Sequence, residues 1–120
     1  MELTLVEEGG VGAVEGQPGQ PFLTNADDIN RVIEACFSYG VHAALLYADN
    51  LPSAFFDLKS GEAGTVLQKM RNYHMRLAVV YPSGSPELSD RFKELLLDER
   101  RGSDFGLFET RAAARAWLAE

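Results

Sequence analysis

The residues with the clearest capacity for chemistry lie in one short segment, at Asp57, Ser60 and Gly61. An apolar pattern typical of a helix follows them, so Ser60 stands near a predicted helix N-terminus. Its hydroxyl can cap that helix by accepting backbone N–H groups. It can instead carry a phosphate or lie beside a bound anion, because exposed N–H groups and the helix dipole favour negative charge there. Both roles remain open from the sequence.

A second candidate binding position is the pair Asp49-Asn50, which follows the apolar run 41–47. In open α/β sheets, ligands bind outside the carboxyl ends of the strands, where such a pair would lie. Asp and Asn are also ordinary turn residues. The glycines of Gly61-x-x-Gly64 fall short of a dinucleotide-binding fingerprint, and we interpret them as allowing a helix to pack closely on a sheet.

No spacing in the sequence assembles residues for catalysis. The carboxylates Asp57 and Glu62 would need environments that separate their pKa values to work as an acid/base pair, and nothing in the sequence indicates such environments. His42 and His74 have no Ser or Cys near them in a recognised nucleophile setting. Cys36 lies on an apolar helical stripe and is interpreted as a core residue. We therefore predict no catalytic residue, no metal and no cofactor, and favour a non-enzymatic function.

Two adjacent aromatic residues, Phe55 and Phe56, follow the turn at Pro52. Two neighbouring large rings rarely both reach one core, so we expect one of them to be partly exposed at a partner-facing surface. The sequence also holds a local concentration of basic residues: Lys69, Arg71, His74 and Arg76. Such a run is typical of a solvated helix end, and a second interpretation is a contact for an acidic partner or a phosphate.

Composition limits the partners that these residues could meet. The 120 residues include 46% hydrophobic and 24% charged ones, as in an average soluble protein, and the length fits one domain spanning 1–120. The formal charge of −7 disfavours nucleic acids and anionic membrane surfaces. Residues 1–8 lack the features of a signal peptide, and no stretch approaches the length of a membrane span. We therefore expect a cytoplasmic protein.

The elements that position the candidate residues follow from apolar periodicity. Alternation predicts a hairpin at 3–6 and 11–14, turned by Gly9-Gly10, and apolar runs predict further strands at 41–47, 77–81 and 105–108. Helical spacing predicts four helices, which begin at Thr24 or Asn25, at Gly61 or Glu62, at Ser85-Pro86, and after the cap Thr110 with Ala113, Ala116 and Trp117 facing inward. The order β-β-α-β-α-β-α-β-α predicts a single α/β domain with a mixed, mostly parallel sheet and an N-terminal hairpin.

The middle of the chain carries a resemblance to a known family. The phenylalanine pair is followed by Asp57, Leu58, Gly61, Ala63 and Gly64, and then by the run Gln68-Lys69-Met70-Arg71-Asn72-Tyr73. This pattern resembles an uncharacterised family of small bacterial proteins, the domain of unknown function numbered 4180. The match is specific for roughly the middle third of the chain. The family has no assigned reaction, so the resemblance implies membership and no activity.

A second resemblance concerns the fold. A strand, then Phe55-Phe56-Asp57, then Ser60-Gly61 opening a helix, is similar to the STAS domain of anti-sigma factor antagonists. In that superfamily a serine at such a helix start is phosphorylated by a partner kinase to switch binding, which implies Ser60 as the modified residue. Leu58 and Lys59 separate Asp57 from Ser60, so the spacing here departs from the regulatory pattern.

These features predict a bacterial, cytoplasmic, non-enzymatic module of the STAS-like type that binds a protein partner, with regulation as its role and a weak homodimer as a further possibility. We expect its working surface in the segment Asp57 to Gly64. The alternative is a small-ligand or anion-binding domain that uses the segment 49–64, with the Asp49-Asn50 turn and the helix start at Ser60. The candidate residues for interaction or ligand binding are Asp49, Asn50, Phe55, Phe56, Asp57, Ser60 and Gly61.

Overall fold

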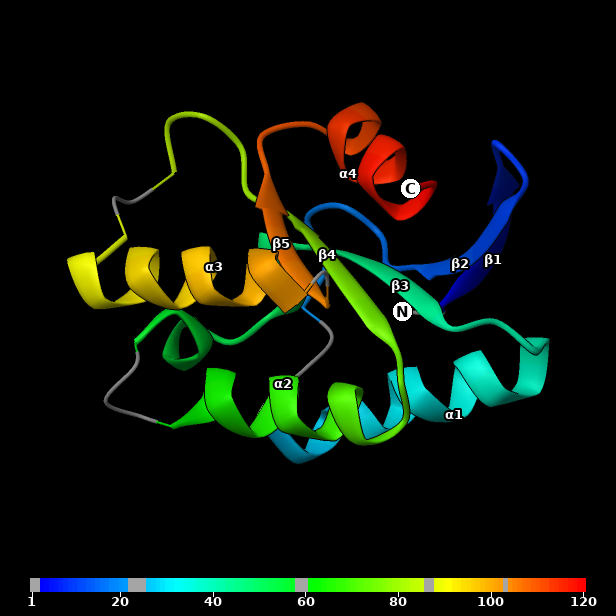
Figure 1. Ribbon diagram of the computed structural model, residues 1–120, viewed down its shortest axis with the longest axis horizontal. Helices are drawn as coiled ribbons and strands as arrows, with labels where there is room; N and C mark the ends of the chain where they lie inside the picture. Colours follow the sequence, from blue (N-terminus) through cyan, green and yellow to red (C-terminus); the bar gives the residue numbers. More distant parts are fainter. Residues whose placement is uncertain (1–2, 22–25, 58–60, 86–87, 103) are drawn as a thin grey trace.

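The sheet has five strands, which lie side by side in the order in which they occur along the chain (Figure 1). A computed structural model describes residues 3–21, 26–57, 61–85, 88–102 and 104–120. The strands are β1 (Thr4–Glu8), β2 (Val11–Glu15), β3 (Ala43–Tyr47), β4 (Arg76–Val80) and β5 (Phe105–Phe108). β1 and β2 are antiparallel, whereas β2, β3, β4 and β5 pair in parallel. The predicted α/β fold class, with its mixed, mostly parallel sheet, is confirmed.

The N-terminal hairpin closes through two glycines, as the sequence predicts. Gly9 and Gly10 have φ values of 61° and 79°, which suit a two-residue hairpin turn and which residues with side chains rarely adopt. The register pairs Thr4 with Glu15 and Glu8 with Val11. Because paired residues share a face and faces alternate along a strand, Glu8 and Glu15 lie on the same face of the sheet.

Three helices connect the parallel strands: α1 (Ile29–Tyr39), α2 (Glu62–Asn72) and α3 (Asp90–Gly102). Each connection moves the chain by one strand in the same direction across the sheet. Right-handed crossovers then put all three helices on one face, and their apolar side chains share one core with that face. The last helix, α4 (Arg111–Leu118), follows β5 and packs on the opposite face (Figure 1).

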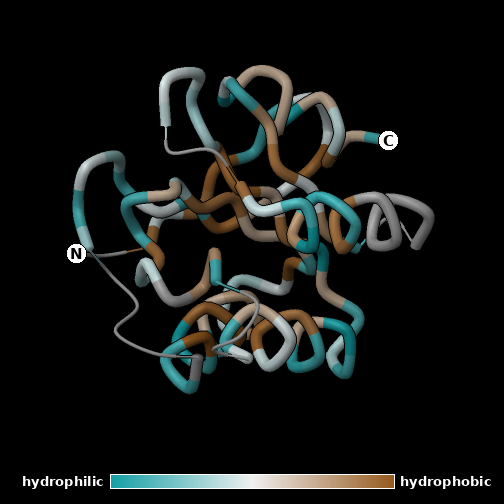
Figure 2. The backbone as a smooth tube through the Cα atoms, turned by 90° about the vertical axis from the view of Figure 1, so that its left-hand side faces the viewer, coloured by the Kyte–Doolittle hydropathy of each residue, from teal (hydrophilic) through white to brown (hydrophobic). Residues whose placement is uncertain are grey.

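Each face of the sheet therefore has its own apolar core. Figure 2 shows hydrophobic segments along the strands in the middle of the molecule and hydrophilic segments at many of the outer turns. The core under α1, α2 and α3 includes the fully buried Phe55, Phe92 and Phe105. The core under α4 is smaller and is built largely from alanines, with Leu45 and Leu118.

α1 ends where the sequence predicts but begins later than predicted. The helix stops at Gly40, as predicted, with a left-handed φ of 69°. It begins at Ile29, after a 3₁₀ turn at Ala26–Asp28. The predicted caps Thr24 and Asn25 lie outside the described residues.

α3 begins later than the sequence predicts. Its first residue is Asp90, not Ser85, because the Ser89 hydroxyl accepts the Phe92 N–H at 3.2 Å and caps the helix there. The Ser85 N–H instead donates to the Pro82 carbonyl at 3.1 Å and closes a turn. A loop thus follows β4 where a helix start is predicted.

α4 is capped as predicted but presents a different face. Thr110 Oγ1 accepts the Ala113 N–H at 3.1 Å, which confirms the cap. The prediction that Ala113 and Ala116 face inward is wrong, since both are exposed, whereas Trp117 is half-buried and packs against the core under α4, as predicted. The buried residues are Ala114, Arg115 and Leu118. The helix is turned so that Arg115 reaches the hairpin, a contact that apolar periodicity does not reveal.

Candidate functional site

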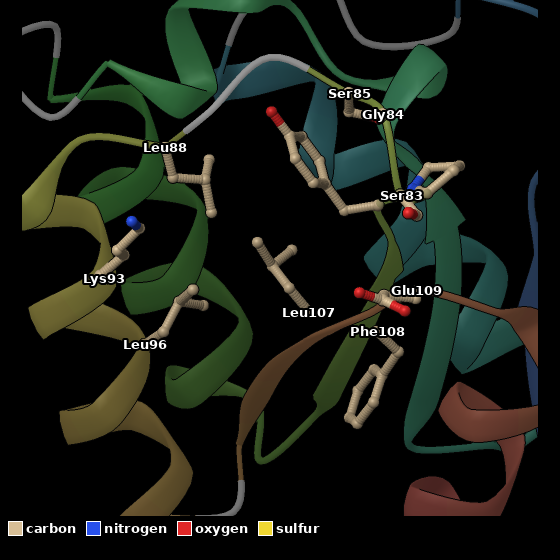
Figure 3. A pocket seen from close by; sticks show the side chains of 11 residues that line it. Ser83, Gly84, Ser85, Leu88, Lys93, Leu96, Leu107, Phe108 and Glu109 are labelled. Carbon is tan, nitrogen blue, oxygen red and sulfur yellow. The ribbon is translucent and has the colours of Figure 1, made fainter.

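An open cavity of about 400 Å³ lies where β4 and β5 end (Figure 3). Its walls come from the loop after β4, from α3 with the residues before it, and from the end of β5. The lining residues are Tyr81, Pro82, Ser83, Gly84, Ser85, Leu88, Lys93, Leu96, Leu107, Phe108 and Glu109. The carboxyl ends of parallel strands are where open α/β sheets bind ligands, so this cavity is the candidate site.

The first wall is the loop that follows β4. The Tyr81 N–H donates to the Phe108 carbonyl at 2.7 Å and extends the pairing of β4 with β5 by one residue. Pro82 has no N–H with which to continue the ladder, so the chain leaves the sheet there. Gly84 takes a φ of 92°, and the turn closed by Ser85 brings two serines to the cavity.

The second wall belongs to α3 and the residue Leu88 before it. Phe92 is fully buried in the core. Lys93 and Leu96 are three residues apart and therefore neighbours on the helix surface, and both line the cavity. Leu88 and Leu96 are half-buried, whereas Lys93 is exposed. This wall therefore presents one cation between two leucines.

The third wall is the end of β5. Leu107 and Phe108 point to opposite faces of the sheet, as neighbours in a strand do: Leu107 packs against the α1–α3 core, and the Phe108 ring contacts Trp117 of α4, with centroids 5.4 Å apart. Glu109 follows the strand and is exposed. Figure 3 shows Glu109 across the cavity from Lys93, with Leu107 between them.

The cavity therefore combines an apolar lining with a cation, an anion and serine hydroxyls. Such a set can hold a small molecule by burying its apolar part and by pairing its polar groups. The two histidines take no part, because His42 precedes β3 and His74 precedes β4, at the other end of these parallel strands. The arrangement at the cavity is suited to binding.

Cys36 is the core residue that the sequence predicts. Its side chain is fully buried in the α1–α3 core, where the thiol donates to the Ala43 carbonyl at 3.7 Å. Burial raises the pKa of the Cys36 thiol to about 11, because a thiolate is poorly solvated there. The thiol is thus protonated at neutral pH and is a poor nucleophile.

Within the predicted site, Asn50 is fully buried and Asp49 is exposed. Asn50 Oδ1 accepts the Tyr47 N–H at 2.8 Å, and Nδ2 donates to the carbonyls of Gln17 and Gln20, both at 2.7 Å. The amide thereby joins the end of β3 to the loop that follows β2. Asn50 is a structural link, and the pair Asp49-Asn50 offers only the Asp49 side chain to a ligand.

The two phenylalanines lie in different surroundings although their rings touch. Phe55 is fully buried, and its ring contacts Phe92 and Phe105, each with a centroid separation of 6.1 Å. Phe56 is half-buried and its ring lies 5.2 Å from that of Tyr81, which lines the cavity. Phe55 therefore has no surface to offer to a partner, and the Phe56 ring packs against a residue of the cavity wall.

The remaining predicted residues are not brought together around a space. Asp57 is exposed. Ser60 lies outside the described residues. Gly61 occupies the N-cap position of α2 with a φ of 76° and has no side chain with which to cap that helix. Of the predicted site residues that the structure describes, none is among those lining the cavity.

Sequence reasoning missed the cavity, although a signal for it exists. Pro82-Ser83-Gly84-Ser85 follows β4 directly, just as Asp49-Asn50 follows β3. The same rule about strand ends therefore applies to both segments. Interpreting Ser85-Pro86 as a helix start conceals this loop, and Lys93 and Glu109 carry no local pattern that marks them.

A second polar cluster, the α4 cluster, lies on the opposite face of the sheet. Arg111 Nε and Nη2 donate to the Glu15 carboxylate at 3.0 and 2.7 Å, and Arg111 also pairs with Glu8. Arg115 Nη1 lies 3.4 Å from Glu15 Oε2, and Nη2 donates to the Val11 carbonyl at 2.9 Å. The side chains of Arg115 and Glu15 are only 7% and 8% exposed. We interpret this cluster as a structural connection between α4 and the hairpin.

The α4 cluster also sets the charge state of its neighbours. The hydrogen bond from Arg111 lowers the pKa of Glu8 below its ordinary value, since it stabilises the carboxylate. Burial raises the pKa of Tyr47, and the negative charge of Glu15 acts in the same direction. At neutral pH, Glu8 is therefore ionised and Tyr47 is neutral.

Comparisons with known proteins identify the family. In the described ranges, no three His, Cys, Asp or Glu side chains are grouped so that they could hold a metal ion, and none of the helices found there is long and apolar enough to cross a membrane. No curated protein and no solved structure matches the chain, so the likeness to STAS domains stays a prediction. One family model matches residues 9–118, and the chain belongs to that family, which is described as a domain of unknown function (DUF4180).

Proposed function

We propose that this protein is a binding module that holds a small ligand in the cavity between the loop after β4, α3 and the end of β5. The observation that supports the proposal is that Lys93, Glu109 and two serines line the same cavity, together with three leucines. Small-molecule sites combine an apolar lining with a few placed polar groups in this way, and the volume of about 400 Å³ falls in their usual range.

The position of the cavity in the sheet supports the proposal. Tyr47, Val80 and Phe108 stand in register at the ends of β3, β4 and β5. The Asp49-Asn50 turn and the cavity thus lie along the same edge, the edge at which open α/β sheets bind ligands. The sequence predicts a ligand site at this edge, at the end of β3. We propose that the site lies at the same edge but at the ends of β4 and β5, because the Asn50 side chain is hydrogen-bonded to the loop after β2.

The lining residues can bind different chemical groups of a ligand. Lys93 can pair with an anionic group, Glu109 can pair with a cationic one, and the hydroxyls of Ser83 and Ser85 can donate to or accept from a neutral polar group. The leucines can bury apolar atoms, which contributes roughly 25 cal/mol per Å² of apolar surface removed from water. These are binding roles, and the proposed function is non-enzymatic.

The test is a map of small-molecule binding by amide chemical shifts. Phenol, 2-propanol and acetamide are titrated separately into the ¹⁵N-labelled protein. We expect shifts at residues 81–85, 93, 96 and 107–109. Ser83→Trp places a large ring at the cavity, where it covers apolar surface that the probes would otherwise bury. The affinity for the probes, measured from these shifts, should fall at least about fivefold.

Ser38→Trp is the matched control, because it makes the same substitution at an exposed position on α1. This variant should respond to the probes as the unsubstituted protein does. Shifts that gather elsewhere on the molecule, or that persist unchanged in Ser83→Trp, would rule out the cavity as the site.

A second candidate function, the protein-interaction and regulatory module predicted from the sequence, is favoured by another surface. Phe37 and Tyr73 are 57% and 48% exposed, yet their rings pack edge to face with centroids 5.5 Å apart. Exposed aromatic groups are enriched at protein interfaces. This surface, with phosphorylation of Ser60 as the switch, would bind a cytoplasmic protein partner or a second copy of the chain.

Sedimentation velocity tests the second candidate in its simplest form. Self-association through the aromatic pair should decrease in Phe37→Ser and stay unchanged in Ser53→Ala, which alters an exposed residue on another segment. A sedimentation coefficient that does not depend on concentration in the unsubstituted protein would remove the homodimer from consideration.

A further inference from the structure

Building on the proposed function, we infer that the ligand is a zwitterion whose ammonium and carboxylate groups are held apart by apolar atoms, as in a dipeptide of apolar amino acids. The cavity presents one cation and one anion on opposite walls, with Leu107 between them and two further leucines on the wall of the cation. A ligand with the complementary order of anion, apolar middle and cation satisfies all three features.

The two charges come from different elements that the fold brings face to face. Lys93 belongs to the first turns of α3, and Glu109 follows β5. Figure 3 shows them at opposite sides of the cavity. Both residues are exposed, so a charged group that enters from solvent can approach each of them.

The apolar middle of the ligand follows from three leucines that line the cavity. Leu88 and Leu96 line the α3 side, and Leu107 lies between Lys93 and Glu109. All three leucines are half-buried, so each keeps apolar surface that a ligand can cover. A side chain such as that of leucine gains free energy by burial on this lining.

A ligand of one charge sign fits less well. An anion would pair with Lys93 but would also face Glu109, in a protein whose formal charge is −7. A cation would pair with Glu109 and face Lys93. A neutral zwitterion avoids both repulsions, and its central amide can bond with the hydroxyls of Ser83 and Ser85.

The experiment removes the two ligand charges and the two protein charges in turn. L-leucyl-L-leucine is titrated by NMR at about pH 6.5, where both termini are charged. The N-acetylated and the C-amidated dipeptides are titrated in parallel. Each modification should weaken binding by about two- to fivefold, the range expected for an exposed ion pair.

Two variants assign each charge to its partner. In Glu109→Gln, acetylation of the dipeptide should no longer weaken binding, whereas amidation still should. In Lys93→Gln, the pattern should be the reverse. The exchange variant Lys93→Glu/Glu109→Lys retains both charges and should bind the free dipeptide about as well as the unsubstituted protein.

The outcomes separate this inference from the proposed function. The zwitterion inference is wrong if the modified dipeptides bind the cavity as tightly as the free one. It is also wrong if acetylation and amidation weaken binding equally in the variants and in the unsubstituted protein. If phenol and 2-propanol bind at 81–85 and 107–109 while the dipeptide does not, the inference fails and the proposed function stands. If neither the probes nor the dipeptide binds there, both fail.

Discussion

Asp49 and Asn50 are adjacent turn residues with opposite roles. Asp49 is exposed, whereas Asn50 is fully buried and forms hydrogen bonds with the backbone of Tyr47, Gln17 and Gln20. The neighbouring Gly16 is part of the same arrangement, because a Cβ atom at that position would lie 2.3 Å from Asn50 Oδ1. The sequence alone cannot separate the two residues, since their difference arises from a loop about thirty positions earlier in the chain.

Replacing Asn50 tests this assignment at the residue scale. Asn50→Ala leaves the Tyr47 N–H and the carbonyls of Gln17 and Gln20 without their partner. Buried polar groups that lose a hydrogen bond cost about 1–3 kcal/mol, so the free energy of unfolding in urea should fall by that amount. Asp49→Ala, the control, should stay within about 0.5 kcal/mol. Equal effects of the two substitutions would show that the Asn50 bonds do not matter for stability.

At the scale of elements, α4 depends on charged residues to hold its place. The helix has only eight residues and covers one face of the sheet. Arg111 and Arg115 bind the hairpin carboxylates. At the other end, Arg76 donates to the carbonyls of Trp117 and Leu118 at 3.2 and 3.1 Å. These contacts link the last helix to the hairpin and to the start of β4, and they fix the rotation of the helix about its axis.

Breaking the buried pair should destabilise the protein strongly. Arg115→Leu leaves the Glu15 carboxylate with Arg111 as its remaining partner, and losing one member of a buried pair costs about 3–5 kcal/mol. We expect the free energy of unfolding in urea to fall by about 3 kcal/mol, the lower end of that range, because Arg111 stays bound to Glu15. The double variant Glu15→Leu/Arg115→Leu should recover part of the loss, since no unpaired buried charge is left.

Arg91→Leu provides the control for that experiment, because Arg91 is exposed on α3. It should change the free energy of unfolding by less than about 0.5 kcal/mol. A loss of similar size in Arg115→Leu and Arg91→Leu would contradict the role of the α4 cluster.

The α4 cluster also predicts a dependence of stability on pH. Arg111 lowers the pKa of Glu8 in the folded protein below its ordinary value of 4.5. A carboxyl group with a depressed folded pKa stabilises the fold above its unfolded pKa, and that stability is lost as the pH falls through the folded value. The urea midpoint of unfolding should therefore fall as the pH is lowered below 4.5. This fall should be smaller in Glu8→Gln than in the unsubstituted protein, because the variant has no carboxyl group to protonate at that position. Parallel curves for both proteins would exclude this contribution.

The order of strands and helices could be predicted from the sequence because apolar periodicity reports it directly. The rotation of α4 could not, since Arg115 is buried by partners in the hairpin, about a hundred positions away. The cavity could not either: its walls meet only after the chain folds, and the Ser89 cap moves the start of α3 past the loop. Local pattern thus predicts elements, and long-range polar contacts decide which of their faces are buried.

At the scale of the whole molecule, strand order explains why the candidate site lies where it does. Sequential strands with right-handed crossovers put α1, α2 and α3 on one face, so every parallel strand delivers its following turn to the same edge. The turns after β3, β4 and β5 share that edge. The turn after β3 is occupied by Asn50 and the core residue Phe55, which leaves the turns after β4 and β5 to form the cavity.

The most direct measurement of the central claim is a set of intermolecular nuclear Overhauser effects between bound L-leucyl-L-leucine or phenol and the protein's methyl groups and aromatic rings. A ligand in the cavity predicts contacts to the methyl groups of Leu88, Leu96 and Leu107, which line it. Contacts confined to the exposed rings of Phe37 and Tyr73, with none to the three leucines, would contradict the account and favour the aromatic surface as the binding site.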